Sequence, residues 1–276
     1  MTFSIVARSA DGQSWGVAVA SRFLAVGAVV PAAVAGLGAV ATQADANVAF
    51  KPLTLVHLDG GATAGEALAR LLESDGGREH RQVGIVDAQG RAASHTGADC
   101  MDWAGGRVGP GYAIQGNILA GEHVVDAMER ALSDGDPGAP LAQLLWGALA
   151  AGDAAGGDRR GRQSAALLVV REGSGYGGVD DIAVDLRVDD HPDPVAELAR
   201  LLALNNLYLT ASTESEKVLV APELAAELDD LARNRGHHDL AAWVGTENYE
   251  MRVAADGSWI DEKILAILRG EENADR

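Results

Sequence analysis

Thr2-Phe3-Ser4-Ile5-Val6-Ala7 follows Met1 in the sequence, and this stretch predicts a buried strand that begins with a threonine. Met before a residue as small as Thr is normally removed, so we expect Thr2 to become the first residue. A terminal Thr carries a hydroxyl and a free α-amine with a pKa of about 8, which can accept the hydroxyl proton near neutral pH. Thr2 is therefore a candidate N-terminal nucleophile. The alternative is that Thr2 simply begins a strand.

The first 80 residues change from a strand pattern to a helix pattern. Residues 2–8 and 15–20 flank a turn at 10–13 and predict a largely buried hairpin. Residues 26–31 and 36–43 predict two further strands. Between residues 52 and 73 the apolar positions take a helical period that is broken at Gly60-Gly61, and Thr63 with Glu66 gives the pattern of a capping box.

The middle of the chain alternates blocks of strands with blocks of helices. Strands are predicted at 81–87, 91–96, 111–117, 164–171 and 184–188, and helices at 121–132, 140–151 and 194–204, with a glycine-rich loop at 152–162. Such blocks indicate two packed sheets with helices outside, rather than a repeated βαβ unit. The sequence therefore predicts an α+β protein.

Residues 205–276 have a different character. They are rich in Glu and Asp, and they predict helices at 223–235 and 261–269, a short apolar segment at 240–244 and a linker at 210–217. We therefore predict two domains, residues 1–209 and a small helical module at 210–276.

Composition argues against several classes of function. The 276-residue chain has a formal net charge of −18, so its surface repels a phosphate backbone and an anionic membrane. The lone Cys100 excludes an internal disulfide and a cysteine-based zinc site. No signal peptide or membrane-spanning run is recognisable, which predicts a cytoplasmic protein. Histidines lack metal-binding spacing and no nucleotide fingerprint follows a strand, so we expect no metal and no cofactor.

A terminal Thr on a buried hairpin, followed by strands, helices and a glycine-rich loop, resembles an N-terminal-nucleophile (Ntn) hydrolase of the proteasome type. Several collinear runs narrow the resemblance to an Ntn-hydrolase-like family, domain of unknown function 1028: 2–8 (TFSIVAR), 16–22 (GVAVASR), 26–31 (VGAVVP), 38–44 (GAVATQA), 115–117 (QGN) and 161–166 (GRQSAA). Residues 243–248 (WVGTEN) and 257–261 (GSWID) also resemble a peptidoglycan-binding-like module that ends some members. The resemblance implies a four-layer αββα sandwich with the terminal nucleophile at the mouth of a cleft between the sheets.

Polar residues at the ends of strands are the candidate partners of Thr2. Arg22 could supply the positive charge that an early lysine provides in proteasome-type enzymes, since Lys51 lies too late in this chain to match. The backbone N–H of Gly116 beside the amide of Asn117 is what an oxyanion hole requires. We take Thr2, Arg22, Gly116 and Asn117 as the catalytic candidates, and Ser21, Gln43, Asp45, Asn47 and Gln115 as candidates for substrate binding. Ordinary strand-end and turn chemistry is the alternative for each partner.

The loop at 156–164 is dense in charge and glycine. Asp158 and Ser164 resemble the Asp and Ser that proteasome-type enzymes place near the nucleophile, although the spacing here is longer. Three arginines, at 159, 160 and 162, suggest a carboxylate-bearing substrate. Asp158, Arg162 and Ser164 therefore join the substrate-binding candidates, and the alternative is a solvated loop paired with surface acids.

The expected activity is hydrolysis of an amide in a small molecule or short peptide, with Thr2 as nucleophile and no cofactor. We expect neither a nucleic-acid nor a membrane partner, and we expect a homo-oligomer. The alternative is a non-catalytic ligand-binding or scaffold protein on the same fold, which binds peptidoglycan fragments through its tail.

Overall fold

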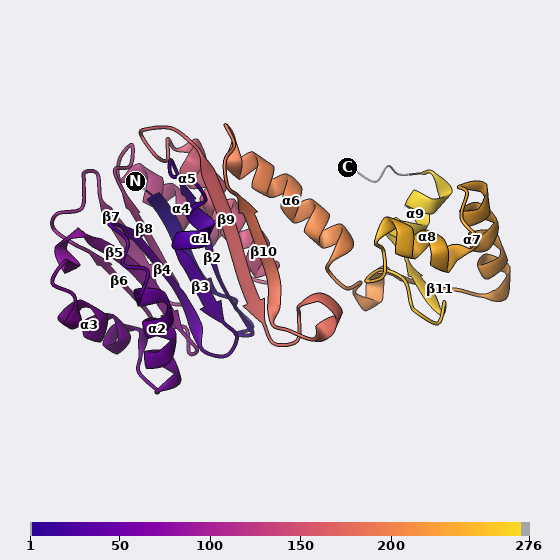
Figure 1. Ribbon diagram of the computed structural model, residues 1–276, viewed down its shortest axis with the longest axis horizontal. Coiled ribbons are helices and arrows are strands. Elements are labelled where there is room, and N and C mark those ends of the chain that lie inside the picture. The colour runs from indigo at the N-terminus through magenta and orange to yellow at the C-terminus, as the bar shows by residue number, and fades with distance from the viewer. Residues whose placement is uncertain (1, 272–276) are drawn as a thin grey trace. The chain divides into compact units, whose positions relative to one another are not determined.

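The computed structural model describes residues 2–271, and the chain divides into two compact units, one up to Arg200 and one from Leu201 onward. The first unit is built on a six-stranded antiparallel sheet with the predicted N-terminal hairpin in its middle (Figure 1). Its strands, in spatial order, are β10 (Ile182–Val188), β9 (Ser164–Arg171), β2 (Ser14–Ser21), β1 (Thr2–Arg8), β8 (Tyr112–Asn117) and β7 (Gly105–Gly109).

A second, four-stranded antiparallel sheet packs against the first. Its order is β3 (Pro31–Val34), β4 (Gly38–Ala44), β5 (Arg81–Asp87) and β6 (Ala92–Thr96). Small and β-branched side chains fill the space between the sheets, among them Val6, Val17, Val19, Ala39, Ala41 and Val86. Such residues suit this layer because two flat sheet faces approach closely only through compact side chains.

Helices cover the outer face of each sheet. Helices α2 (Phe50–Asp59) and α3 (Ala64–Ser74) pack on β4, β5 and β6, whereas α4 (His123–Asp134) and α5 (Leu141–Ala154) pack on β1, β2 and β8. The result is the four-layer αββα sandwich that was predicted (Figure 1). The predicted capping box is also confirmed: Thr63 Oγ1 accepts a hydrogen bond from Glu66 N at 3.1 Å, and Glu66 Oε2 accepts one from Thr63 N at 2.8 Å.

The single strand predicted at 26–31 is wrong. Residues Val26–Val29 form the short helix α1, and β3 begins only at Pro31. Ala25 turns the chain with a φ of 52°, and Val26 N donates to Ser164 Oγ at 3.1 Å, so the local hydrogen bonds favour a helical turn over strand pairing. Pro31 lies in an edge strand, where its missing N–H costs little. Strand β7 was not predicted, because three of its five residues are glycine.

The second unit holds the predicted helices together with a small sheet that was not predicted. Helix α6 (Pro194–Tyr208) runs into this unit, which contains α7 (Pro222–Asn234), α8 (Leu240–Glu247), α9 (Glu262–Arg269) and the strands β11 (Lys217–Leu219) and β12 (Trp259–Asp261). Trp243, Tyr249 and Ile260 are at the centre of its core. Within residues 2–271, no helix is both long enough and apolar enough to cross a membrane.

Candidate functional site

Thr2 and Ser21 meet at one end of the central hairpin. Thr2 begins β1 and Ser21 ends the antiparallel neighbour β2, so the Phe3–Ala20 pairing brings the two side by side. Thr2 Oγ1 lies 3.1 Å from Ser21 Oγ, a hydrogen-bond distance. Both residues are buried, with 6% and 2% of their surface exposed. The hydroxyl of Thr2 is therefore held in a defined direction by a neutral neighbour.

Two amide side chains hold the backbone carbonyl of Thr2. Gln43 Nε2, on the second sheet, donates to Thr2 O at 3.2 Å. Asn117 Nδ2 donates to the same oxygen at 3.5 Å, from the strand position that pairs directly with Thr2. The structure thus brings together Thr2, Ser21, Gln43 and Asn117, four of the residues singled out from the sequence.

The amides of Gln43 and Asn117 are fixed in turn by Gln82, which sequence reasoning missed. Gln82 Oε1 accepts from Gln43 Nε2 at 2.8 Å and from Asn117 Nδ2 at 2.9 Å, while Gln82 Nε2 donates to Gly116 O at 2.8 Å. Gln82 is fully buried in β5. The local signal was a glutamine beside the apolar run at 83–86, because a polar side chain buried with such a run needs partners.

Ser4 and Gln115 extend this polar network away from Thr2. Gln115 Nε2 donates to Ser4 Oγ, and Ser4 Oγ donates to Gln43 Oε1, both at 2.6 Å. Gly116 lies inside β8 between β1 and β7, and a Cβ there would come within 2.4 Å of Leu119 Cδ1. Both Gln115 and Gly116 lie in the strand that leads to Asn117, and Ser4 was not anticipated from the sequence.

Hydrogen bonds between side chains and backbone join Arg22 to the loop that follows α5. We call this set of contacts, made by Arg22, Asp158 and Arg160, the clasp. Asp158 is buried, and its Oδ2 accepts a hydrogen bond from Arg22 N at 2.7 Å and pairs with Arg160 Nη2 at 3.2 Å. Arg160 Nη2 also donates to Arg22 O at 3.1 Å, and Arg22 Nη1 returns a bond to Arg160 O at 3.0 Å. The clasp anchors the loop at 158–162 beside the end of β2.

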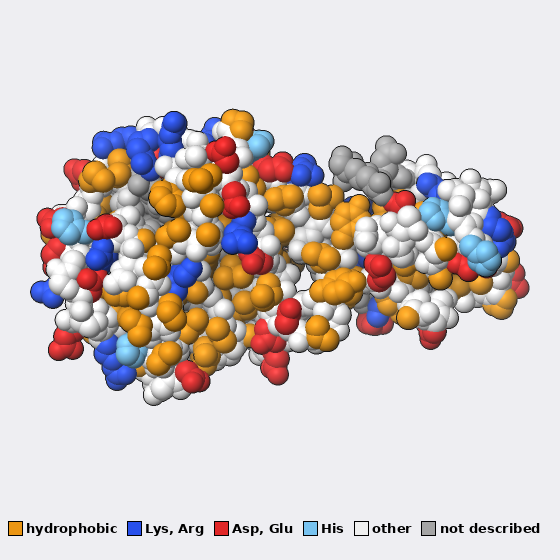
Figure 2. All heavy atoms as spheres, viewed as in Figure 1, with side chains coloured by type: hydrophobic (Ala, Val, Ile, Leu, Met, Phe, Trp, Pro, Cys, Tyr) orange, Lys and Arg blue, Asp and Glu red, His pale blue; other side chains and the backbone are white. Residues whose placement is uncertain are grey.

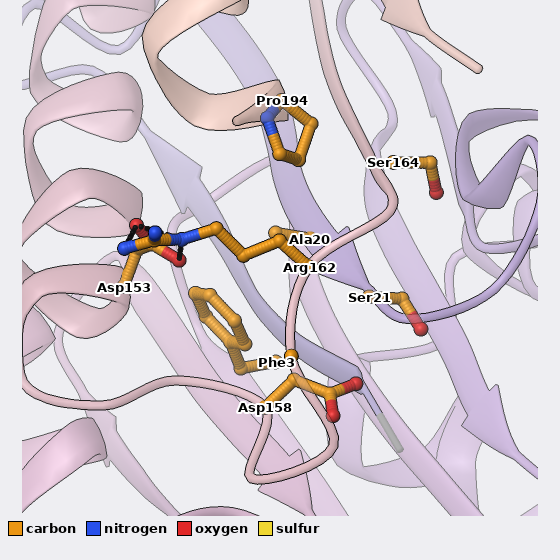
Figure 3. A pocket seen from close by; sticks show the side chains of 9 residues that line it. Phe3, Ala20, Ser21, Asp153, Asp158, Arg162, Ser164 and Pro194 are labelled. Atoms are coloured by element: carbon orange, nitrogen blue, oxygen red, sulfur yellow. Dashed lines mark hydrogen bonds and ion pairs between the residues drawn. The ribbon is translucent and has the colours of Figure 1, made fainter. Parts of the chain in front are cut away.

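A small pocket opens beside the clasp (Figure 3). Its cavity volume is about 10 Å³, enough for about one water molecule, and far below the roughly 300–1,000 Å³ of pockets that hold drug-sized ligands. Ser21, Asp158 and Ser164 line it together with Phe3, Ala20, Asp153, Gly161, Arg162 and Pro194.

Two of the predicted residues around this pocket are engaged with protein partners. Ser164 Oγ donates to Phe23 O at 2.5 Å, and it accepts from Val26 N. Arg162 Nη2 pairs with Asp153 Oδ2 at 2.8 Å, as Figure 3 shows. The hydrogen bonds to Asp153 raise the pKa of Arg162 above its usual value, so this guanidinium stays charged and paired.

The predicted residues Asp45 and Asn47 belong to another polar cluster. Asp45 Oδ2 lies 3.0 Å from Arg81 Nη1, and Asn47 Nδ2 donates to Asp75 Oδ2 at 3.4 Å. Arg81 also pairs with Asp75 at 2.7 Å, and this hydrogen bond lowers the pKa of Asp75 to about 2. Neither Asp45 nor Asn47 contributes a hydrogen bond to Thr2 within residues 2–271. In the same range, no group of three or more His, Cys, Asp or Glu side chains is placed to hold a metal ion.

Comparisons with known proteins agree with the organisation of the chain. Residues 2–198 match the model of the "Family of unknown function (DUF1028)", and residues 225–268 match that of the "Putative peptidoglycan binding domain". No curated protein matches. A crystal structure from Silicibacter pomeroyi, of a protein assigned to the same family, is 30% identical over 74% of this chain and 86% of its own, with a TM-score of 0.67.

Two further similar structures are more distant. Anbu (ancestral beta-subunit) from Yersinia bercovieri is 12% identical over 73% of this chain and 93% of its own, with a TM-score of 0.34. An Anbu (Gly-1) mutant from Hyphomicrobium sp. strain MC1 is 11% identical over 74% and 94%, with a TM-score of 0.36. The match over residues 2–198 covers well over half of the chain, and this protein therefore belongs to the family of unknown function DUF1028.

Proposed function

We propose that the protein is an N-terminal-nucleophile amide hydrolase that acts on a small molecule or short peptide, with Thr2 as nucleophile once Met1 is removed. Met1 itself lies outside the described residues. The observation that carries the proposal is the placement of Thr2: its hydroxyl lies 3.1 Å from Ser21 Oγ, at the end of the central hairpin. The pocket lined by Ser21 and Asp158 adjoins this position.

The chemistry follows from having the base and the nucleophile on one residue. The α-amine of Thr2 takes the proton of Oγ1 as Oγ1 bonds to the amide carbon. The amide C–N bond then breaks, and the departing amine takes that proton. Water attacks the resulting ester, releases a carboxylic acid and restores the hydroxyl. Ser21 orients the Thr2 hydroxyl. Gln43 and Asn117 hold the backbone carbonyl of Thr2, which fixes the residue that carries both the hydroxyl and the α-amine.

Of the two predicted oxyanion donors, Gly116 is paired with Phe3 and Gly105 within the sheet, so we propose the side-chain amide of Asn117 as the donor. Asn117 Nδ2 donates to Gln82 Oε1 at 2.9 Å and only loosely to Thr2 O, at 3.5 Å. The longer bond is the easier one to exchange, because a hydrogen bond weakens as it lengthens. A tetrahedral oxyanion that forms at Thr2 can therefore compete for this donor.

The test is turnover by wild type, Thr2→Ala and Thr2→Ser across a panel of N-acyl amino acids, dipeptides and cyclic amides. We expect Thr2→Ala to lose several orders of magnitude in rate and Thr2→Ser to retain measurable activity, because Ser keeps both the hydroxyl and the amine. The melting temperature of Thr2→Ala should stay within about 3 °C of wild type, since one hydrogen bond at a strand end is lost. Equal turnover by wild type and Thr2→Ala would exclude the mechanism.

A second candidate is a ligand-binding protein that keeps this fold without turnover. It is favoured by the neutrality of Thr2's surroundings: within residues 2–271, the hydrogen-bond partners of Thr2 are Ser21, Gln43 and Asn117, and none carries a positive charge. The match at 225–268 makes soluble peptidoglycan fragments the ligands to test first. Binding of a fragment by both wild type and Thr2→Ala, with hydrolysis by neither, would favour this candidate.

A further inference from the structure

Two ion pairs involve the C-terminal end of α5 and the loop that follows it. Asp158 pairs with Arg160 at 3.2 Å, and Asp153 pairs with Arg162 at 2.8 Å. Each of these two aspartates therefore neutralises one guanidinium. Arg160 and Arg162, although close to the pocket, are poor candidates for a free anion-binding group.

Two arginines of the same region lack a carboxylate partner within residues 2–271. Arg22 donates from Nη1 to the carbonyl of Arg160, which is a neutral partner. Arg159 follows Asp158 directly, and its backbone N–H donates to Ile118 O, next to Asn117. Both arginines are exposed. The protein has a formal charge of −18, so most of its surface repels an anion, whereas a guanidinium without a carboxylate partner attracts one.

Arg22 is held in place rather than left to move freely. Its backbone N–H and C=O are both fixed by the clasp with Asp158 and Arg160. Its Nη1 lies so close to Gly161 that a Cβ at this pocket-lining residue would come within 3.0 Å. A guanidinium that is already positioned loses less conformational entropy when it binds, and its planar fork matches a carboxylate.

Arg22 also lies at the same end of the first unit as Thr2. It follows Ser21, whose hydroxyl contacts Thr2 Oγ1. Figure 2 shows Lys and Arg side chains gathered at the end of the larger unit where Figure 1 marks the N-terminus. The guanidinium of Arg22 reaches the loop at Arg160 and Gly161, and Gly161 and Ser21 both line the pocket beside the end of β2.

We propose that Arg22, assisted by Arg159, binds a carboxylate of the substrate, so that the substrate class is an N-acyl amino acid or a short peptide with a free carboxylate close to the scissile amide. This assignment rests on the proposed function for the identity of the scissile bond. Binding of a carboxylate at Arg22 and Arg159 does not depend on hydrolysis, because neither residue takes part in the reaction of Thr2.

The experiment measures binding in the Thr2→Ala background, where hydrolysis cannot interfere. The probes are N-acetyl-Ala, N-acetyl-Ala-Ala and N-acetyl-Glu, each paired with its C-terminal carboxamide and with a phosphate-monoester analogue, and titrated by calorimetry. We expect the acid to bind about ten-fold more tightly than its carboxamide, because a charge-assisted hydrogen bond is roughly twice as strong as a neutral one. The preference should shrink as salt is raised, since the arginines are exposed.

Arg22→Gln and Arg159→Gln are the test variants, and Arg70→Gln, on an exposed position of α3 at the outer face of the other sheet, is the matched control. Two contacts of the clasp use the backbone of residue 22, and only the exposed bond from Nη1 to Arg160 O is lost, so Arg22→Gln should fold normally, with a melting temperature within about 3 °C of wild type. We expect Arg22→Gln to reduce the acid preference to less than about three-fold, Arg159→Gln to reduce it partly, and Arg70→Gln to preserve it.

Other outcomes overturn the carboxylate assignment and leave the proposed function to be judged separately. No acid preference in any pair, an undiminished preference in Arg22→Gln, or tighter binding of the phosphate monoester would each contradict it. Turnover that depends on Thr2 but treats acid and carboxamide alike would retain the hydrolase and reject the site. An Arg22-dependent acid preference without hydrolysis by wild type would retain the site and reject the hydrolase.

Discussion

Thr2 Oγ1 and Ser21 Oγ lie 3.1 Å apart at the shared end of β1 and β2, and both residues are buried. Ser21 also pairs with Ser164 across the next strand of the sheet, so three hydroxyl-bearing residues of β1, β2 and β9 lie in one row. A hydroxyl held in this way has one preferred direction, which a nucleophile needs before its substrate arrives.

Ser21→Ala should therefore lower turnover by about ten-fold without abolishing it, because Thr2 keeps its own base but loses the group that orients its hydroxyl. The cost in stability should be about 1 kcal/mol, the usual value of one hydrogen bond. Ser14→Ala is the matched control, since Ser14 is a buried serine at the opposite end of the same strand. Equal turnover losses in Ser14→Ala and Ser21→Ala would show that Ser21 has no particular role toward Thr2.

Gln82→Met should destabilise the protein by roughly 2–4 kcal/mol in urea denaturation. Gln82 bonds Gln43, Asn117 and the carbonyl of Gly116 in the buried layer between the sheets, and the substitution leaves these groups short of a partner in a dry environment. Gln89→Met, on an exposed turn position, is the control and should change stability by less than about 0.5 kcal/mol. A Gln82→Met loss no larger than the control would show that the network contributes little.

Asp75→Asn should reduce stability at neutral pH by roughly 1–3 kcal/mol, and the difference from wild type should narrow as pH falls from about 4 toward 2. The Arg81 hydrogen bond holds the pKa of Asp75 at about 2 in the folded protein, whereas the unfolded value is about 3.9. Because the folded pKa is the lower one, the stabilisation is complete above the unfolded pKa and is lost as the carboxylate becomes protonated.

Urea denaturation at several pH values between 6 and 3 measures this effect. Glu73→Gln, which removes an exposed acid from the preceding turn of α3, is the control and should leave the pH profile of stability unchanged. A constant gap between Asp75→Asn and wild type down to pH 3 would contradict the assignment of acid sensitivity to the Asp75–Arg81 pair.

Local patterns in the sequence predicted much of the fold because they report on single strands and helices. The alternation at 2–8 and 15–20 gave the central hairpin, and Thr63 with Glu66 gave the start of α3. Apolar periodicity gives no signal where glycines or a left-handed residue determine the backbone. Strand β7, with three glycines, was therefore not predicted, and the helix α1 after Ala25 was predicted as a strand.

The site was predictable only as far as strand ends allowed. Ser21, Gln43 and Asn117 end or nearly end strands that lead to Thr2, and the structure brings these four residues together. Asp45 and Asn47 follow the same strand as Gln43, yet they turn toward Asp75 and Arg81, because loop hydrogen bonds and not strand register place them. The polar character of Gln82 is visible in the sequence, but its contacts with Gln43 and Asn117 depend on how the two sheets stack, which the sequence of one strand does not encode.

The intact mass of the purified protein, before and after reaction with a strained lactone that acylates activated hydroxyls, tests the central claim most directly. We predict a mass that lacks Met1, a single added acyl group, and fragmentation that places this group on Thr2. The adduct should be absent from Thr2→Ala and retained in Ser14→Ala. A protein that keeps Met1 and still hydrolyses amides, or a productive adduct on any other residue, would contradict Thr2 as the nucleophile.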